Sequence, residues 1–171
     1  MQRQIPWFER TFSTGHDPRL AAEIIARLDG APARAAAAAH ACSSERLVRS
    51  PGGTWSVHEN IAHLEDLDRV LFMPRLEQFA SGADVLQPAD VTNATTNNAN
   101  HHARSIDNVL AGFAASRRRI TDHLDAVEPG RFADTALHER LGIRMSLMDL
   151  CVFIAEHDDS HLARIRELMS L

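Results

Sequence analysis

Apolar and polar positions recur with the period of an α-helix along four long stretches of the chain. These stretches are rich in Ala, Leu, Arg and Glu, which have high helix propensity, and Gly and Pro gather between them. The pattern predicts main helices at about 18–41, 57–80, 103–127 and 147–169. No stretch alternates cleanly like a strand, and only 137–145 is a short candidate for extended structure. The expected fold is therefore all-α, a four-helix bundle.

Local signals mark where several of these helices begin or bend. Ser56 is a good N-cap for the second helix, and Glu59 three residues later completes a capping box. Ser146 can cap the fourth helix in the same way. Gly30 interrupts the first helix and Pro74 lies inside the second, so we expect a bend at each.

The length of 171 residues is that of one compact domain, so a single domain over 1–171 is expected. Its 44% apolar and 24% charged residues are typical of a soluble globular protein, which argues against disorder.

A net charge of −5 gives no electrostatic reason to expect a nucleic-acid partner. Every basic residue is Arg, which excludes a Schiff-base lysine. The connection 81–102 is unusually long, so we expect it to be functional or mobile.

Two cysteines, Cys42 and Cys151, do not make a disulfide framework, and Cys151 is interpreted as a small core residue. The N-terminal residues lack the apolar core of a signal peptide. The apolar runs are interrupted by charges well before the roughly 20 residues that a membrane span needs. We therefore expect a reduced, cytoplasmic setting with no membrane contact.

The most informative residues are histidines, of which the chain has ten. His157 and His161 are spaced i and i+4, which places both rings on one face of the fourth helix. That face also carries Ile154 and Ile165, so both imidazoles point into the bundle. Two adjacent buried imidazoles are hard to satisfy with protein partners alone, and a metal ion satisfies both. A solvated or core histidine pair is the alternative.

His63 of the second helix also lies on a partly apolar face and would add a third imidazole. Three protein ligands leave open positions on a metal, as catalytic sites require. Glu59 lies one turn before His63, where it could hydrogen-bond the ring of His63 or act on a metal-bound water. The capping box gives Glu59 a structural role as well.

The segment with Trp55, Ser56, Glu59, His63 and Leu64 resembles the W-S-x-x-E-x-x-x-H-L signature of the DinB-like superfamily. The pair His157 and His161 is similar to the second motif of that family. The resemblance implies a DinB/YfiT-like bundle of up-down-down-up type, often dimeric. It also implies a divalent metal ion, zinc or nickel, held by His63, His157 and His161. Relatives include bacillithiol transferases and mycothiol-dependent maleylpyruvate isomerase, and YfiT-like members are regarded as metal-dependent hydrolases.

The preferred hypothesis is a metal-dependent S-transferase that joins a low-molecular-weight thiol, as co-substrate, to a small electrophile. Hydrolysis is one alternative, a non-catalytic metal-stabilised module in dimerisation or stress response is another, and a core without metal is the last. Apolar residues cover wide arcs of the first and third helices, which together with the family resemblance predicts a homodimer. Metal affinity should fall with pH where the free imidazoles, of reference pKa about 6.5, become protonated.

Other polar and aromatic residues have plainer interpretations. Trp55 is expected to pack under the turn before the second helix, with a pocket wall as the alternative. Asp158 is expected to be solvated or to support the site indirectly. His101 and His102 are expected to be a solvated pair, with an approach over the end of the bundle toward the metal as the alternative. The run 117–119 of three arginines is interpreted as a solvated helix face, although one could point inward and bind a substrate carboxylate.

Overall fold

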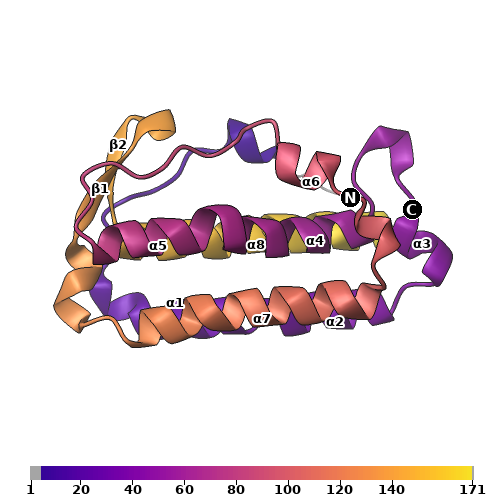
Figure 1. Cartoon of the computed structure of the whole chain (residues 1–171), viewed down its shortest axis with the longest axis horizontal. Helices are drawn as coiled ribbons and strands as arrows, with labels where there is room; N and C mark the ends of the chain where they lie inside the picture. Colours follow the sequence, from indigo (N-terminus) through magenta and orange to yellow (C-terminus); the bar gives the residue numbers. More distant parts are fainter. Residues whose placement is uncertain (1–4, 171) are drawn as a thin grey trace.

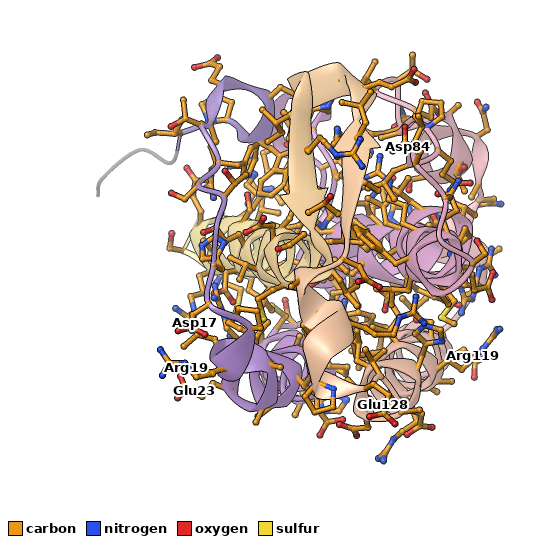
Figure 2. All side chains as sticks on the ribbon, turned by 90° about the vertical axis from the view of Figure 1, so that its left-hand side faces the viewer. Asp17, Arg19, Glu23, Asp84, Arg119 and Glu128 are labelled. Atoms are coloured by element: carbon orange, nitrogen blue, oxygen red, sulfur yellow. The ribbon has the colours of Figure 1, made fainter. Side chains whose placement is uncertain are left out.

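The computed structural model describes residues 5–170, and four long helical rods form the body of the fold (Figure 1). The rods are α1 (Ala21–Asp29) with α2 (Ala31–His40), α4 (Val57–Leu67) with α5 (Met73–Ala80), α7 (Ile106–Asp125), and α8 (Leu147–Met169). All four predicted helices are present, and the bounds of α8 are those predicted. Seen along the rods in Figure 2, the helices form a square with charged residues such as Arg119 and Glu128 on its outside.

Two of the rods are interrupted where the sequence predicts a bend. The first is interrupted at Gly30, which separates α1 from α2. The second contains a π-helical turn, Asp68–Phe72, immediately before α5. Pro74 lacks a backbone N–H, and its ring would crowd the carbonyl of Val70 in a regular helix. The wider turn that precedes Pro74 relieves this clash.

Both predicted N-caps are formed. The hydroxyl of Ser56 accepts a hydrogen bond from the backbone N–H of Glu59, and the Glu59 carboxylate accepts one from the Ser56 N–H at 2.8 Å. Ser146 and Asp149 form a second capping box at the start of α8. These reciprocal bonds satisfy orphan N–H groups and fix where α4 and α8 begin.

The rods run up, down, down and up, as the colour sequence in Figure 1 shows. The rods that end with α5 and begin with α7 are consecutive along the chain but run in the same direction. The chain must therefore return along the length of the bundle between the end of α5 and the start of α7. The connection 81–105 does this, and it carries the short helix α6 (Ala94–Asn98) over α4 (Figure 1). Its length thus follows from the topology.

The remaining elements are short. An antiparallel hairpin joins β1 (Thr135–His138) to β2 (Ile143–Ser146), so the candidate for extended structure at 137–145 is confirmed at its two ends. Gly142, with φ of +65°, ends the turn between them. One further α-helix is α3 (Ser44–Val48), and single 3₁₀ turns lie at Trp7–Glu9, Pro18–Leu20, Pro51–Gly53, His101–Ala103, Pro129–Ala133 and Glu139–Leu141. No helix within residues 5–170 has both the length and the apolar character that crossing a bilayer requires.

Most of the large apolar side chains of the first and third rods are covered by the chain itself. Leu28, Val109 and Phe113 are buried in the core, and Ile24 and Ile25 pack partly buried against it. Ala33 and Ala37 of the alanine run in α2 stay exposed. A homodimer stays a prediction.

A fully buried ion cluster connects three of the rods. Arg117 of α7 is 1% exposed, and its guanidinium contacts Asp68 at 2.9 Å and both carboxylate oxygens of Asp158. It also donates a hydrogen bond to the carbonyl of Leu28. The prediction of a solvated Arg117 is wrong, and so is that of a solvated Asp158, which is fully buried. Arg117 does point inward, but protein carboxylates neutralise its charge, so it is not free to bind a substrate.

Replacement of Arg117 should strongly destabilise the bundle. An Arg117→Met variant leaves two buried carboxylates without a counter-charge, and we expect a loss of about 3 kcal/mol or more in the free energy of unfolding. The matched control is Arg119→Met, because Arg119 lies exposed on the same helix (Figure 2). That variant should change stability by about 0.5 kcal/mol or less. Equal urea midpoints for the two variants would contradict a structural role for the ion cluster.

Candidate metal centre

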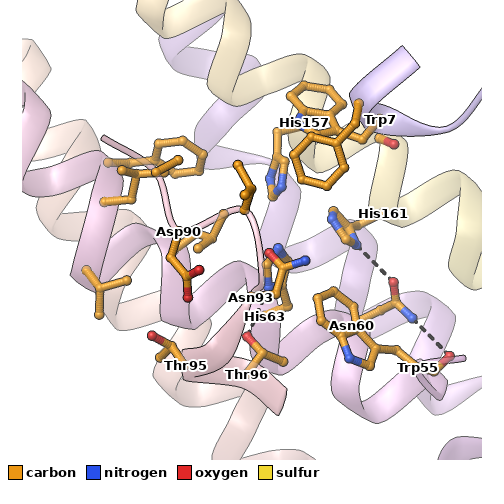
Figure 3. A pocket seen from close by; sticks show the side chains of 18 of the residues that line it. Trp7, Trp55, Asn60, His63, Asp90, Asn93, Thr95, Thr96, His157 and His161 are labelled. Carbon is orange, nitrogen blue, oxygen red and sulfur yellow. Dashed lines mark hydrogen bonds between the residues drawn. The ribbon is translucent and has the colours of Figure 1, made fainter. Parts of the chain in front are cut away.

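The fold brings three histidines together at the centre of its loop-covered face. His63 comes from α4, and His157 and His161 come from successive turns of α8 (Figure 3). One ring nitrogen from each lies within 4.8 Å of the other two. The ring centroids are 5.4 Å apart for His63 and His157, 4.7 Å for His63 and His161, and 4.6 Å for His157 and His161. The helix-face argument from the sequence predicted this arrangement.

A hydrogen-bond chain fixes the tautomer of His63. Its Nδ1 lies 2.9 Å from the hydroxyl oxygen of Thr96, and that hydroxyl donates its proton to Asp66 at 2.9 Å. The Thr96 oxygen must therefore accept from His63, so Nδ1 carries the hydrogen. His101 also contacts the Asp66 carboxylate, at 3.0 Å. The lone pair on Nε2 of His63 is left free for a metal ion.

His161 is oriented in the same manner by Asn60. Nδ1 of His161 lies 2.9 Å from the amide oxygen of Asn60, while the amide nitrogen of Asn60 donates to the carbonyl of Ser56 at 2.8 Å. The same nitrogen also donates to the carbonyl of Trp55 at 3.3 Å (Figure 3), and these bonds determine which end of the amide faces the imidazole. Nδ1 of His161 is thus the donor, and its Nε2 also keeps a free lone pair.

His157 is the imidazole that protein groups leave unsatisfied. Its Nδ1 is buried and has no hydrogen-bond partner among the described residues. Aromatic rings surround it instead, with the centroid of Trp7 at 5.0 Å and that of Phe72 at 5.5 Å, both edge to face. A buried polar atom without a partner is costly. Three neutral imidazoles, two with anchored tautomers and one with an unpaired ring nitrogen, form a donor set that suits a borderline divalent cation.

Burial keeps all three imidazoles uncharged. The pKa of His63 and that of His157 lie well below the usual value of a histidine. Desolvation is the main cause, and electrostatic repulsion by the neighbouring His161 is the second. Desolvation, followed by the charge of Arg10, lowers the pKa of His161 to about 4. The rings are therefore in the neutral form that a metal requires at pH 7. Protons therefore compete with a metal ion for these rings at a lower pH than the reference pKa of about 6.5, which the sequence argument used, would suggest.

The three imidazoles form part of the wall of a large pocket of about 1060 Å³. Trp55 forms another part, with its ring 4.5 Å from that of His63 and 6.1 Å from that of His161. The indole N–H of Trp55 donates to Asn97 at 2.9 Å, which ties α6 to this wall. The alternative role predicted for Trp55, a pocket wall, is therefore confirmed.

Glu59 is placed at the start of α4, away from the imidazole cluster. Its carboxylate accepts hydrogen bonds from the N–H and the hydroxyl of Ser56, both at 2.8 Å, and it is not part of the pocket wall. The ring nitrogen of His63 that Glu59 was expected to hold is bonded to Thr96.

The neighbouring pair of histidines also differs from expectation. His101 is 5% exposed and bonded to Asp66, so the prediction of a solvated His101 is wrong. His102 is partly exposed, as predicted, and lies 3.0 Å from the Ser56 hydroxyl. Neither belongs to the described cluster of possible metal ligands.

Four residues that support the cluster were missed from the sequence: Asn60, Asp66, Thr96 and Trp7. Asn60 had a usable signal, because it lies one turn before His63 on the same helix. Thr96 and Trp7 come from segments far from the motifs, and no spacing in the sequence links them to the histidines.

The chain belongs to the DinB superfamily, whose family model matches residues 27–165. This match runs from the end of α1 into the last turns of α8 and includes all three histidines. The family resemblance seen in the motifs is therefore confirmed.

Among solved structures, the chain is similar to YfiT from Bacillus subtilis, with a TM-score of 0.75 and 19% sequence identity. The match covers 93% of this chain and 91% of that one. That protein is described as a probable metal-dependent hydrolase with an unusual four-helix bundle topology. At this identity the likeness establishes the shared fold. No curated protein matches the sequence.

The buried imidazoles should make the metal-free protein sensitive to mild acid. A histidine whose folded pKa is lowered binds fewer protons in the folded state than in the unfolded state below about pH 6.5. Stability should therefore fall from pH 6.5 to pH 5, with a slope that approaches about 1.4 kcal/mol per pH unit near pH 5 for each fully neutral buried ring such as His157. Urea unfolding in EDTA at several pH values measures this slope.

A His157→Gln variant should lose one ring's contribution to this dependence of stability on pH. His40→Gln is the control, because His40 is exposed and lies outside the cluster. A wild-type stability that is constant over this pH range would show that these rings are not held neutral.

Proposed function

We propose that His63, His157 and His161 bind a divalent metal ion, zinc or nickel, and that the protein is a metal-dependent enzyme. The reaction proposed is transfer of a low-molecular-weight thiol to a small electrophile. The observation that supports this most directly is the set of three imidazole nitrogens within 4.8 Å of one another in the wall of a large pocket. When bound, such an ion is a Lewis acid that lowers the pKa of a thiol or a water beside it.

The chain's own residues would prepare this chemistry. Thr96 and Asn60 hold the rings of His63 and His161 with their Nε2 lone pairs free. Trp7 and Trp55 flank the cluster with their apolar rings. A pocket of about 1060 Å³ is large enough for a thiol and an electrophile together.

The carboxylates of the pocket favour a thiol over water as the nucleophile. Asp90 and Glu167 are the acidic residues of the described pocket wall. Asp90 accepts hydrogen bonds from the N–H groups of Thr92 and Ala94, and Glu167 pairs with Arg164. Neither is free as a general base. A thiol, with a reference pKa of about 8.5, needs much less help to ionise than water.

The thiol would be a co-substrate and not a side chain. Burial raises the pKa of the Cys151 thiol to about 12, and neither cysteine lines the pocket. We assign no proton transfer to Glu59, because its carboxylate is used in the capping box. The cytoplasm, where small thiols are kept reduced, is the compartment that fits this proposal.

Hydrolysis is the second candidate. It is favoured by the likeness to YfiT, described as a probable metal-dependent hydrolase. A homodimer, as the family resemblance implies, is compatible with both reactions because all three histidines come from one chain.

The hydrogen bond from His63 to Thr96 should matter for metal affinity. A Thr96→Val variant removes the acceptor that holds the ring, and we expect zinc to bind about 10–100-fold more weakly. Calorimetric titration with zinc measures this change. Thr95→Val is the matched control, because Thr95 is exposed and adjacent in sequence. Equal zinc affinity in both variants would show that Thr96 does not orient a ligand.

Turnover assays separate the candidate reactions. We expect the zinc- or nickel-loaded protein to consume a small thiol in the presence of 1-chloro-2,4-dinitrobenzene. A His157→Ala/His161→Ala double variant should lose this activity, and His40→Ala should keep it. Turnover of p-nitrophenyl acetate without thiol consumption would replace the proposal with hydrolysis. Metal-induced stabilisation with no turnover of either compound would favour the non-catalytic module.

A further inference from the structure

A buried arginine lines the same pocket, at a distance from the cluster of three histidines. Arg75 of α5 is 1% exposed and forms part of the pocket wall. It follows His63 by twelve residues along the same rod, which corresponds to roughly 18 Å at the helical rise. The pocket therefore extends from the imidazole cluster to a guanidinium at its other end.

The groups that hold Arg75 are all uncharged. Its Nε and Nη2 donate to the carbonyl of Gln87, at 3.1 and 2.8 Å, and its Nη1 lies 3.1 Å from Nε2 of His138. A guanidinium has five N–H donors, so these contacts do not use all of them. No carboxylate among the described residues forms an ion pair with Arg75. A buried charge without a counter-charge is costly unless something else neutralises it.

Arg117 shows how this chain neutralises a buried arginine that serves the fold. Its exposure is the same 1%, but two buried carboxylates, Asp68 and Asp158, surround it. Arg75 has equal burial and no such partners, and it faces a cavity. The difference indicates that the missing negative charge of Arg75 comes from a bound molecule.

The neighbours of Arg75 strengthen the need for an anion. Because Nε2 of His138 accepts from Arg75, its Nδ1 carries the hydrogen, and this buried atom has no partner in another described residue. Arg140 also lines the pocket and lies close enough to act on both. The pKa of Arg75 is lowered to about 10, mainly by burial and secondly by the charge of Arg140. Burial, followed by the charges of Arg75 and Arg140, lowers that of His138 to about 4.

The wall between the two ends of the pocket is apolar. Leu67, Leu71, Phe72 and Phe153 line it. Its rim carries four of the six large apolar side chains that the described chain leaves exposed, Ile5, Phe8, Val70 and Val91. A gathering of exposed apolar side chains around a cavity is typical of a site for an apolar ligand.

We propose that Arg75 and His138 form a subsite for the carboxylate of an elongated substrate whose body is apolar. The carboxylate would accept from the unused N–H groups of Arg75 and from Nδ1–H of His138. The apolar body would lie along the wall toward the histidines. The placement of the reacting end at the imidazoles rests on the proposed function, whereas the carboxylate subsite does not.

The two tryptophans of the chain both line this pocket, so their fluorescence reports its occupancy. The probes are decanoate and the uncharged 1-decanol, titrated in EDTA so that the carboxylate cannot bind a metal. Wild type should bind decanoate about tenfold or more tightly than decanol. Arg75→Met should remove this preference and leave decanol affinity unchanged. The control Arg119→Met, far from the pocket wall, should behave as wild type.

Equal binding of decanoate and decanol by wild type would overturn the proposal, and so would unchanged decanoate affinity in a folded Arg75→Met variant. Should that variant unfold, because Arg75 also holds Gln87, His138→Leu tests the same subsite with Arg75 in place. It should weaken decanoate about threefold or more and leave decanol unaffected. Unchanged decanoate affinity there would equally count against the proposal. Because every titration is done without metal, failure of the metal proposal would not change these results.

Discussion

The buried guanidinium of Arg117 determines how the helices that carry the histidines lie against each other. A charge in the interior must be neutralised, and Arg117 is neutralised from two rods at once, by Asp68 after α4 and by Asp158 of α8. Asp158 directly follows His157 in the chain, and Asp68 lies five residues after His63. A shift of either helix along the other would separate a carboxylate from the cation. The ion cluster that holds the bundle therefore also holds the imidazoles in register.

The topology explains why the site lies on only one face. With α5 and α7 in parallel rods, the connection 81–105 has to cross the bundle, and it does so over α4 and α8 (Figure 1). This crossing brings Thr96 to His63 and Asn97 to Trp55. The opposite side of the α4 and α8 layer packs on α7 and the first rod and is closed by Arg117. An interior closed by the Arg117 ion cluster thus supports a pocket whose polar groups are only partly paired.

Local patterns predicted much of this from the sequence. The helices, both N-caps, the capping box of Ser56 and Glu59, and the inward histidines follow from periodicity and spacing, because these depend on neighbours in the chain. The solvated position expected for Asp158 was wrong because α8 is buried on several sides. The side of α8 that carries Asp158 therefore faces Arg117 and not solvent. The roles of Thr96 and Arg75 depend on contacts across 33 and 63 residues, which no local pattern encodes.

The account depends on the three imidazoles being one metal site. Anomalous diffraction from a crystal of the zinc-loaded protein, recorded on both sides of the zinc edge, tests this directly. We predict one strong anomalous peak per chain, in contact with His63, His157 and His161 together. A peak bound to other residues, or no peak at these imidazoles in a crystal grown with excess zinc, would contradict the account.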